Sequence, residues 1–343
     1  MKFANAMKPQ TQREGAVLIR QPPSFLRNKV AIVHQFIGSR QLALLIFILI
    51  LVIVISQLSP NFLTARNFQT ITRNMPELLL MTSGMSLVLI TGGIDISAES
   101  ILGIAAIVIG KALLAGCHPV LSAVAGIFVA TCLCALNGFL IAYIKLPAIV
   151  VTLGTMYLWR SVIFLLVGGR WLSGIPRVLD PIVKTVVAGI VLPFYFSILI
   201  VLIMQFVYTF TAYGCHVRAI GTNEQASRLC GIAVNRKKFY AYVIFGVLLG
   251  IAAIFYVGKY RNVEMTVAQG MSLEALAAAI IGGTSVLGGS GNFIGCLLGV
   301  FFLLLLRNAL VLLHVPSVWD NAVLGGLILC GFIVDLTMRY EKK

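Results

Sequence analysis

The sequence is poor in charged residues. Of its 343 residues only 11% are Asp, Glu, Lys or Arg, whereas a soluble globular domain carries about 25%. Apolar residues make up 59% of the chain, and the mean hydropathy is +1.00. A nucleic-acid-binding protein would need its Lys and Arg residues on a solvent-exposed surface, but here long stretches of the sequence carry no charged residue at all. The composition therefore indicates a polytopic membrane protein with a lipid bilayer, and no nucleic acid, as its partner.

Patterns of metal-binding and catalytic residues are also missing. The seven cysteines are odd in number and lie mostly in apolar runs without zinc-site spacing, so we interpret them as packing residues. The four histidines are far apart, and neither H-E-x-x-H nor G-x-S-x-G occurs. The sequence therefore predicts no metal site, no cofactor and no enzymatic centre in this chain.

A phosphate-binding loop is absent as well. Such a loop has the pattern G-x-x-x-x-G-K-[ST], and the only Gly-Lys pairs here are Gly110-Lys111 and Gly258-Lys259. Neither pair has a glycine five positions before it, and neither lysine is followed by Ser or Thr. This chain therefore does not hydrolyse ATP by itself.

Long apolar segments dominate the rest of the chain. A bilayer core of about 30 Å takes roughly 20 helical residues, and this length predicts an all-α polytopic membrane protein. Two of the segments are short and run into glycine pairs, which is typical of broken helices beside a transport path or of ordinary helix ends. The ten segments are 42–58, 76–92, 98–115, 119–143, 148–167, 194–212, 239–257, 272–287, 293–313 and 317–337, and the short ones are the second and the eighth.

The distribution of Lys and Arg predicts the orientation. If the N-terminus is cytoplasmic, 16 of the 26 Lys and Arg residues lie on the cytoplasmic side of the membrane and eight on the opposite side, and the other two lie within spans. This excess on the cytoplasmic side favours two cytoplasmic termini. Seven of the sixteen belong to a basic tail, residues 1–41, which precedes a transmembrane domain over 42–338. Residues 339–343 form a second cytoplasmic tail.

The longest interior loop, residues 213–238, has a pattern of its own. Asn223 can cap a short helix beginning at Glu224, and Gly231 lies where a C-terminal cap is expected. Ala226, Leu229 and Cys230 would form a small apolar face on that helix. The loop is either a docking helix for a cytoplasmic partner or a plain positively charged connector.

Five segments resemble the permease subunit of bacterial sugar ABC importers, the branch that includes the ribose, xylose, arabinose, rhamnose and autoinducer-2 systems. AIGTNEQASRLCGI (219–232) resembles the cytoplasmic coupling loop of that family. The other similar stretches occur in the family's order over residues 42–338: ITGGIDIS (90–97), the run 137–160, AIIGGTSVLGGSGNFIG (279–295) and the run 307–335. The chain departs from the family at Cys215, where arginine is usual, and at Ala98-Glu99-Ser100, where Ser-Val-Gly is common.

The resemblance implies import of a monosaccharide or similar polyol-like solute by alternating access in the bacterial inner membrane. The implied partners are a cytoplasmic ATP-binding subunit, which uses the ATP, a second permease chain, identical or paralogous, and a periplasmic sugar-binding protein. GGRWLSGIP (168–176) looks closest to the autoinducer-2 and rhamnose members. The residues implied in ATPase coupling are Gly221, Asn223, Glu224, Ala226, Arg228 and Gly231.

Polar residues in the spans are candidates for the solute path, because hydroxyls and amides can hydrogen-bond a sugar without trapping it. The competing interpretation is that small polar residues hold helices together. An arginine in a span is costly and needs a partner or a wet cavity, and Asp95 is the candidate partner for Arg160. The candidate path residues are Asn137, Thr152, Thr155, Arg160, Thr284 and Ser285.

Two other functions compete with an ATP-driven importer. An ion-coupled secondary sugar carrier is the main alternative, although carboxylates within the spans are few and such carriers usually need them. A structural membrane scaffold would explain neither the glycine-broken spans nor the capped interior helix.

Overall fold

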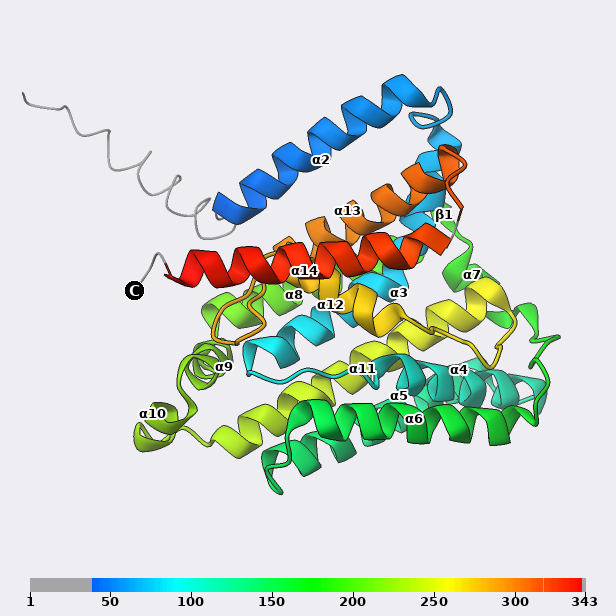
Figure 1. The fold of residues 1–343 in the computed structure, drawn as a ribbon. Helices are drawn as coiled ribbons and strands as arrows, with labels where there is room; N and C mark the ends of the chain where they lie inside the picture. Colours follow the sequence, from blue (N-terminus) through cyan, green and yellow to red (C-terminus); the bar gives the residue numbers. More distant parts are fainter. Residues whose placement is uncertain (1–38, 317, 341–343) are drawn as a thin grey trace, which may run out of the picture. The chain divides into compact units, whose positions relative to one another are not determined.

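The structure is a computed structural model, and it describes residues 39–316 and 318–340 (Figure 1). Within these residues it contains thirteen α-helices, one 3-10 turn and one two-stranded antiparallel hairpin. The predicted all-α class is therefore confirmed. The predicted tails lie almost wholly outside the described residues.

Ten helices correspond one by one to the ten predicted segments. Six of them are long and apolar enough to cross a membrane, by length and composition: α2, α5, α6, α8, α11 and α13. The bounds of the ten are α2 (Ser39–Leu58), α3 (Ala65–Ile90), α4 (Ala98–Leu114), α5 (Pro119–Ala142), α6 (Ala148–Val167), α8 (Leu192–Phe210), α11 (Val234–Tyr260), α12 (Met271–Ile281), α13 (Phe293–Leu312) and α14 (Val318–Tyr340).

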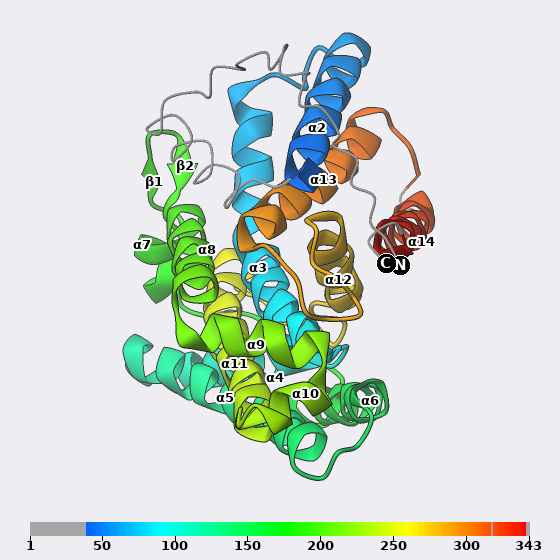
Figure 2. The same cartoon turned by 90° about the vertical axis from the view of Figure 1, so that its left-hand side faces the viewer.

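Short elements connect the long helices at two opposite ends. At the right of Figure 1 lie α7 (Asp180–Val183) and β1 (Val186–Val187), which pairs with β2 (Ile190–Val191) after η1 (Arg177–Leu179). At the left lie α9 (Ala212–Thr222) and α10 (Glu224–Leu229), which face the viewer in Figure 2. We call these two sides of the helical domain the α7 end and the α10 end.

Helix α3 lies at the centre of the packing, in contact with α8, α11, α12 and α13. Every residue from 75 to 90 of this helix is buried. Helix α11 packs closely on α5, where glycines replace larger residues: a β-carbon on Gly250 would lie 2.5 Å from the Cα atom of Ile127. Because the backbones approach so closely, little space is left between these helices.

The structure corrects the second predicted span. Segment 76–92 is neither short nor broken, because α3 begins at Ala65, where the Thr64 hydroxyl accepts a hydrogen bond from the Asn67 N–H at 3.3 Å. The first turns of α3 are polar, so a search for apolar runs missed them. By contrast, the eighth span is short as predicted: α12 ends at Ile281, and an irregular glycine-rich loop, residues 282–292, follows it.

The structure also corrects the interior loop. Residues 213–238 are mostly helical, since they include nearly all of α9, all of α10 and the first turn of α11. The Thr211 hydroxyl caps α9 by accepting from the Gly214 N–H at 3.4 Å. A β-carbon at Gly214 would collide with the backbone of Tyr208, so glycine is required where the chain turns from α8 into α9.

Candidate functional site

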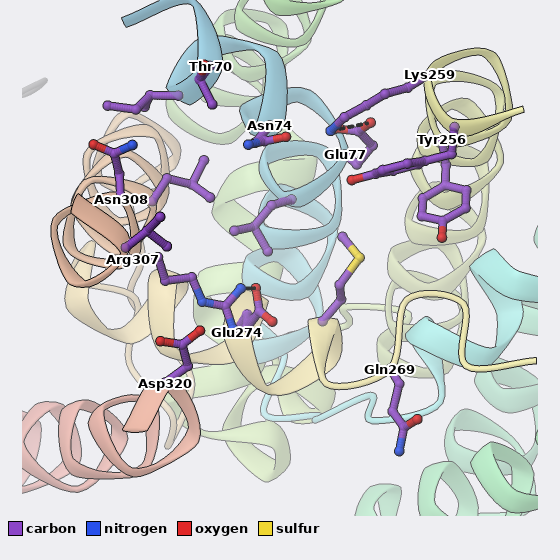
Figure 3. A pocket seen from close by; sticks show the side chains of 16 residues that line it. Thr70, Asn74, Glu77, Tyr256, Lys259, Gln269, Glu274, Arg307, Asn308 and Asp320 are labelled. Carbon is purple, nitrogen blue, oxygen red and sulfur yellow. Dashed lines mark hydrogen bonds and ion pairs between the residues drawn. The ribbon is translucent and has the colours of Figure 1, made fainter. Parts of the chain in front are cut away.

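A cavity of about 590 Å³ lies among α3, α11, α12, α13 and α14 (Figure 3). It takes residues from the beginning of α3, α12 and α14 and from the end of α11 and α13, so it lies toward the α7 end. We call it the α7-end cavity. Its polar lining residues are Thr70, Asn74, Glu77, Tyr256, Lys259, Tyr260, Gln269, Glu274, Arg307, Asn308 and Asp320; Figure 3 labels all of them except Tyr260.

Two ion pairs cross this cavity between different helices (Figure 3). Lys259 Nζ of α11 lies 3.4 Å from Glu77 Oε1 of α3, and both side chains are nearly buried, at 9% and 5% exposure. Arg307 Nη1 of α13 donates to Glu274 Oε2 of α12 at 2.6 Å. Charged groups in membrane-spanning helices need a partner or water, and here they have a partner and line a cavity with further polar residues. The cavity can therefore hold a hydrated or hydroxyl-rich solute.

The wall of the cavity is tied together by amide groups. Asn67 Nδ2 of α3 donates to Asn308 Oδ1 of α13 at 2.8 Å, and Asn308 Nδ2 donates back to Asn67 Oδ1 at 2.7 Å. Sequence reasoning missed this site. The available signal was the charge of Glu77, Glu274 and Arg307 beside apolar runs, but their pairing across helices is not visible in the sequence.

Two of the predicted path residues contact the segment 91–97, which leads from α3 to α4. Asn137 Nδ2 donates to Ser97 Oγ at 2.8 Å, and Thr152 Oγ1 donates to the Ile94 carbonyl at 3.2 Å. Both side chains are fully buried, whereas Thr155 is half-buried and donates to the Thr152 carbonyl at 3.3 Å. None of the three lines the α7-end cavity.

The other two hydroxyl residues lie in the loop 282–292. Thr284 is buried, with its hydroxyl 2.7 Å from that of Ser86 on α3, and Ser285 is buried beside it. Neither residue lines the α7-end cavity. Thr284 thus joins the loop to α3, and the role of all these polar residues in a solute path stays a prediction.

The predicted partner of Arg160 is wrong. Arg160 Nη2 pairs with Glu99 Oε1 at 2.9 Å, whereas Asp95 Oδ1 accepts from the Ser97 amide and hydroxyl. Segment 91–97 runs beside α6, with Ile94 next to the first turn and Glu99 about two turns further along. Asp95 is therefore too near the α10 end to reach Arg160. The partner of Arg160 is instead Glu99, an acidic residue at a position where the resembled family commonly has valine.

The predicted short helix is present as α10. Asn223 Oδ1 accepts from the Ala226 N–H at 3.0 Å, and Gly231 has the left-handed backbone (φ 77°) that ends the turn after the helix. Ala226 and Cys230 are exposed, and the Leu229 side chain is 90% exposed. The predicted apolar face is thus uncovered at the α10 end. The last coupling candidate, Gly221, lies in the final turn of α9.

Glu224 fastens α10 to the start of α11. Its carboxylate accepts from Arg228 Nη2 at 2.6 Å and from Lys238 Nζ at 2.5 Å, and Arg228 also donates to Asn235 Oδ1 at 2.9 Å. Partial burial opposes ionisation of Glu224, but the two cationic donors outweigh it and hold the pKa of the carboxyl below its usual value. The coupling candidates Glu224 and Arg228 therefore hold α10 in place.

Known proteins resemble the chain over most of its length. A family model described as "Branched-chain amino acid transport system / permease component" matches residues 67–331. The autoinducer 2 import system permease protein LsrC of Yersinia pseudotuberculosis serotype O:3 (strain YPIII) is 33% identical over 297 residues, which cover 87% of this chain and 84% of that protein. The corresponding protein of Yersinia pestis (strain Pestoides F) is 32% identical over the same shares. No solved structure gives a significant match.

The matched range includes most of α3, the whole of α9 to α13 and the first part of α14. Together with the apolar helices, it identifies a multi-pass membrane protein that is a transport component rather than an enzyme. The chain belongs to the family of branched-chain amino acid transport system permease components, and its relatives include permeases of autoinducer 2 import systems.

Proposed function

We propose that this chain is the permease subunit of an ATP-driven importer in the bacterial inner membrane, and that its solute is autoinducer-2 or a similar small polyol-like molecule. The single observation that carries the proposal is the arrangement of the two ends: a polar cavity toward one end and an exposed, capped helix at the other. The named function of the relatives supports the same assignment.

The polar groups of the cavity suit a hydroxylated solute. A branched aliphatic side chain needs an apolar pocket, because its burial is driven by the loss of contact with water. The α7-end cavity has apolar lining residues, but it also offers carboxylates, amides and hydroxyls on several helices, including Glu274, Asn308 and Tyr256. Such groups provide both donors and acceptors for sugar hydroxyls. The predicted path residues, Asn137, Thr152, Thr155, Arg160, Thr284 and Ser285, would belong to deeper parts of the path.

The α10 end would be the cytoplasmic side, where a separate ATP-binding subunit docks. Leu229 and Ala226 are exposed there without covering residues from the described part of the chain, and large exposed apolar side chains beside charged ones are typical of docking surfaces. The termini would then be cytoplasmic, a periplasmic binding protein would deliver the solute at the α7 end, and a second permease chain would complete the pore.

Reconstitution in vesicles tests this proposal. The purified chain would be incorporated with its ATPase subunit and supplied with binding protein, and uptake of labelled autoinducer-2, rhamnose, ribose and leucine would be measured. We expect uptake of a hydroxylated solute only when ATP and the binding protein are both present. Uptake driven by a proton or sodium gradient without ATPase would overturn the proposal in favour of a secondary carrier.

A further inference from the structure

Helices α3, α12 and α13 line the α7-end cavity, and they also lie close together at the opposite end of the domain, around the loop 282–292. Helix α3 carries Glu77 in the cavity and ends at Ile90, which is thirteen residues or about 20 Å further along at ~1.5 Å per residue. Helix α12 ends and α13 begins on either side of the loop 282–292. This loop and the end of α3 are joined directly, since the Gly289 N–H donates to the Ile90 carbonyl at 2.9 Å.

Gly221 of α9 is inserted into this meeting point. A β-carbon on Gly221 would collide with the Ile90 carbonyl oxygen and with the Gly289 nitrogen, which are both backbone atoms. A β-carbon on Gly288 would come within 3.2 Å of the backbone of Gly221 and of Gly92. The three chain segments therefore touch backbone to backbone. We call the group Gly92, Gly221, Gly288 and Gly289 the glycine junction.

The loop on the far side of the junction is held by four further polar contacts. Its Gly291 N–H donates to the Tyr208 hydroxyl at 3.1 Å, and the following Phe293 N–H donates to Gln205 Oε1 at 2.9 Å. Its Thr284 hydroxyl bonds Ser86 of α3 at 2.7 Å, and the Gly282 carbonyl accepts from the side chain of Gln41 at 3.3 Å. The loop is therefore anchored to α2, α3 and α8.

We propose that the glycine junction is the element through which the docking helix α10 controls the α7-end cavity, with Gly221 as the positioning residue. This inference rests on the proposed function. Flexible side chains between two elements can absorb a small displacement by changing rotamer, whereas packed backbone cannot. A shift of α9 and α10 by the ATPase would pass through Gly221 to the ends of α3, α12 and α13. These three helices carry Glu77, Glu274 and Arg307 into the cavity.

The test compares two glycine-to-alanine substitutions in the full transporter. Gly221→Ala adds a methyl group at the junction, and Gly325→Ala adds one on α14 where nothing lies within 4 Å. Both are made in a background in which the exposed native cysteines are replaced by alanine and Asn74→Cys places a reporter thiol in the cavity lining. The readouts are solute uptake, ATP hydrolysed per solute imported, co-purification of the ATPase, and maleimide labelling of the reporter thiol with and without nucleotide.

We expect Gly325→Ala to behave as the parent protein. Gly221→Ala should still co-purify with the ATPase, because α10 and its exposed face are unchanged, but uptake should fall at least about tenfold. Labelling of the reporter thiol should no longer respond to nucleotide. Wild-type uptake, or a preserved response of the reporter thiol, in Gly221→Ala would overturn the inference. Failure of the wild-type protein, with its native Asn74, to import any solute with ATP would instead overturn the proposed function.

A second variant keeps the inference testable if Gly221→Ala does not fold. Ser86→Ala adds no atoms and removes the 2.7 Å hydrogen bond between α3 and Thr284. It should raise the ATP hydrolysed per solute imported while the protein remains assembled with its ATPase. An unchanged ratio in Ser86→Ala, with folding intact, would show that the loop is not part of the transmission.

Discussion

Arg160 on α6 and Glu99 in the first turn of α4 form a 2.9 Å ion pair that also fixes the segment leading into α12. Arg160 Nη1 also donates hydrogen bonds to the carbonyls of Met265 and Val267. Glu99 Oε2 accepts a hydrogen bond from the Gly270 N–H at 2.8 Å. Gln269, in the same segment, lines the α7-end cavity. The pair therefore shapes one wall of that cavity without lining it.

Neutralising either partner of this pair should destabilise the protein. Glu99→Gln leaves a partly buried guanidinium without its counter-charge, since Arg160 is only 25% exposed. We expect a loss of about 1–3 kcal/mol in the free energy of unfolding, measured as a lowered melting temperature in detergent. The exchange Glu99→Arg with Arg160→Glu should recover part of the loss. Rescue by an exchange with Asp95 instead would contradict the assignment.

The sequence predicts the helices better than it predicts their contacts. The caps of α10 were predictable because an asparagine cap and a left-handed glycine act within a few residues. The start of α3 was not, because its first turns are polar and mostly exposed and lie outside the apolar run. The partner of Arg160 and the pairs Lys259–Glu77 and Arg307–Glu274 join residues far apart in the chain. Such pairings depend on how the helices pack, so the cavity could not be predicted from one sequence.

Arg307 and Glu274 should be needed for solute transport rather than for assembly. Arg307→Gln and Glu274→Gln each remove one charge from the lining of the cavity and leave its partner unpaired. We expect uptake to fall about tenfold or more, which corresponds to a loss of ~1.4 kcal/mol in the binding free energy of the solute. Co-purification of the ATPase should stay normal. Asp180→Asn is the matched control, since Asp180 pairs with Lys184 at the α7 end but does not line the cavity. Equal loss of uptake in the control would contradict a specific role of the cavity.

The exposed face of α10 should bind the ATPase subunit. Ala226→Trp places a bulky ring on that face, so we expect both transport and ATPase co-purification to be abolished. Leu229→Ala should weaken the association by about tenfold, because a fully buried leucine contributes ~1.5–3 kcal/mol through its apolar surface. Leu114→Ala, at the exposed end of α4 near the α7 end, is the control and should leave the association unchanged. A stable complex and wild-type uptake in Ala226→Trp would show that the partner docks elsewhere.

Acid should loosen α10 from α11, and the titrating group should be Glu224. The folded pKa of this carboxyl is depressed, so its ionised form stabilises the link at pH values above its unfolded pKa, and this contribution is lost as the pH falls through the folded pKa. A fluorescent dye on Cys230, which is exposed beside α10, should report no change from pH 8 to about pH 5 and a transition below the usual glutamate value of ~4.3. Glu224→Gln should abolish that transition and show the loosened signal at neutral pH, while Asp180→Asn should leave the curve unchanged. A transition centred above pH 5, or one that persists in Glu224→Gln, would mean that another group controls the position of α10.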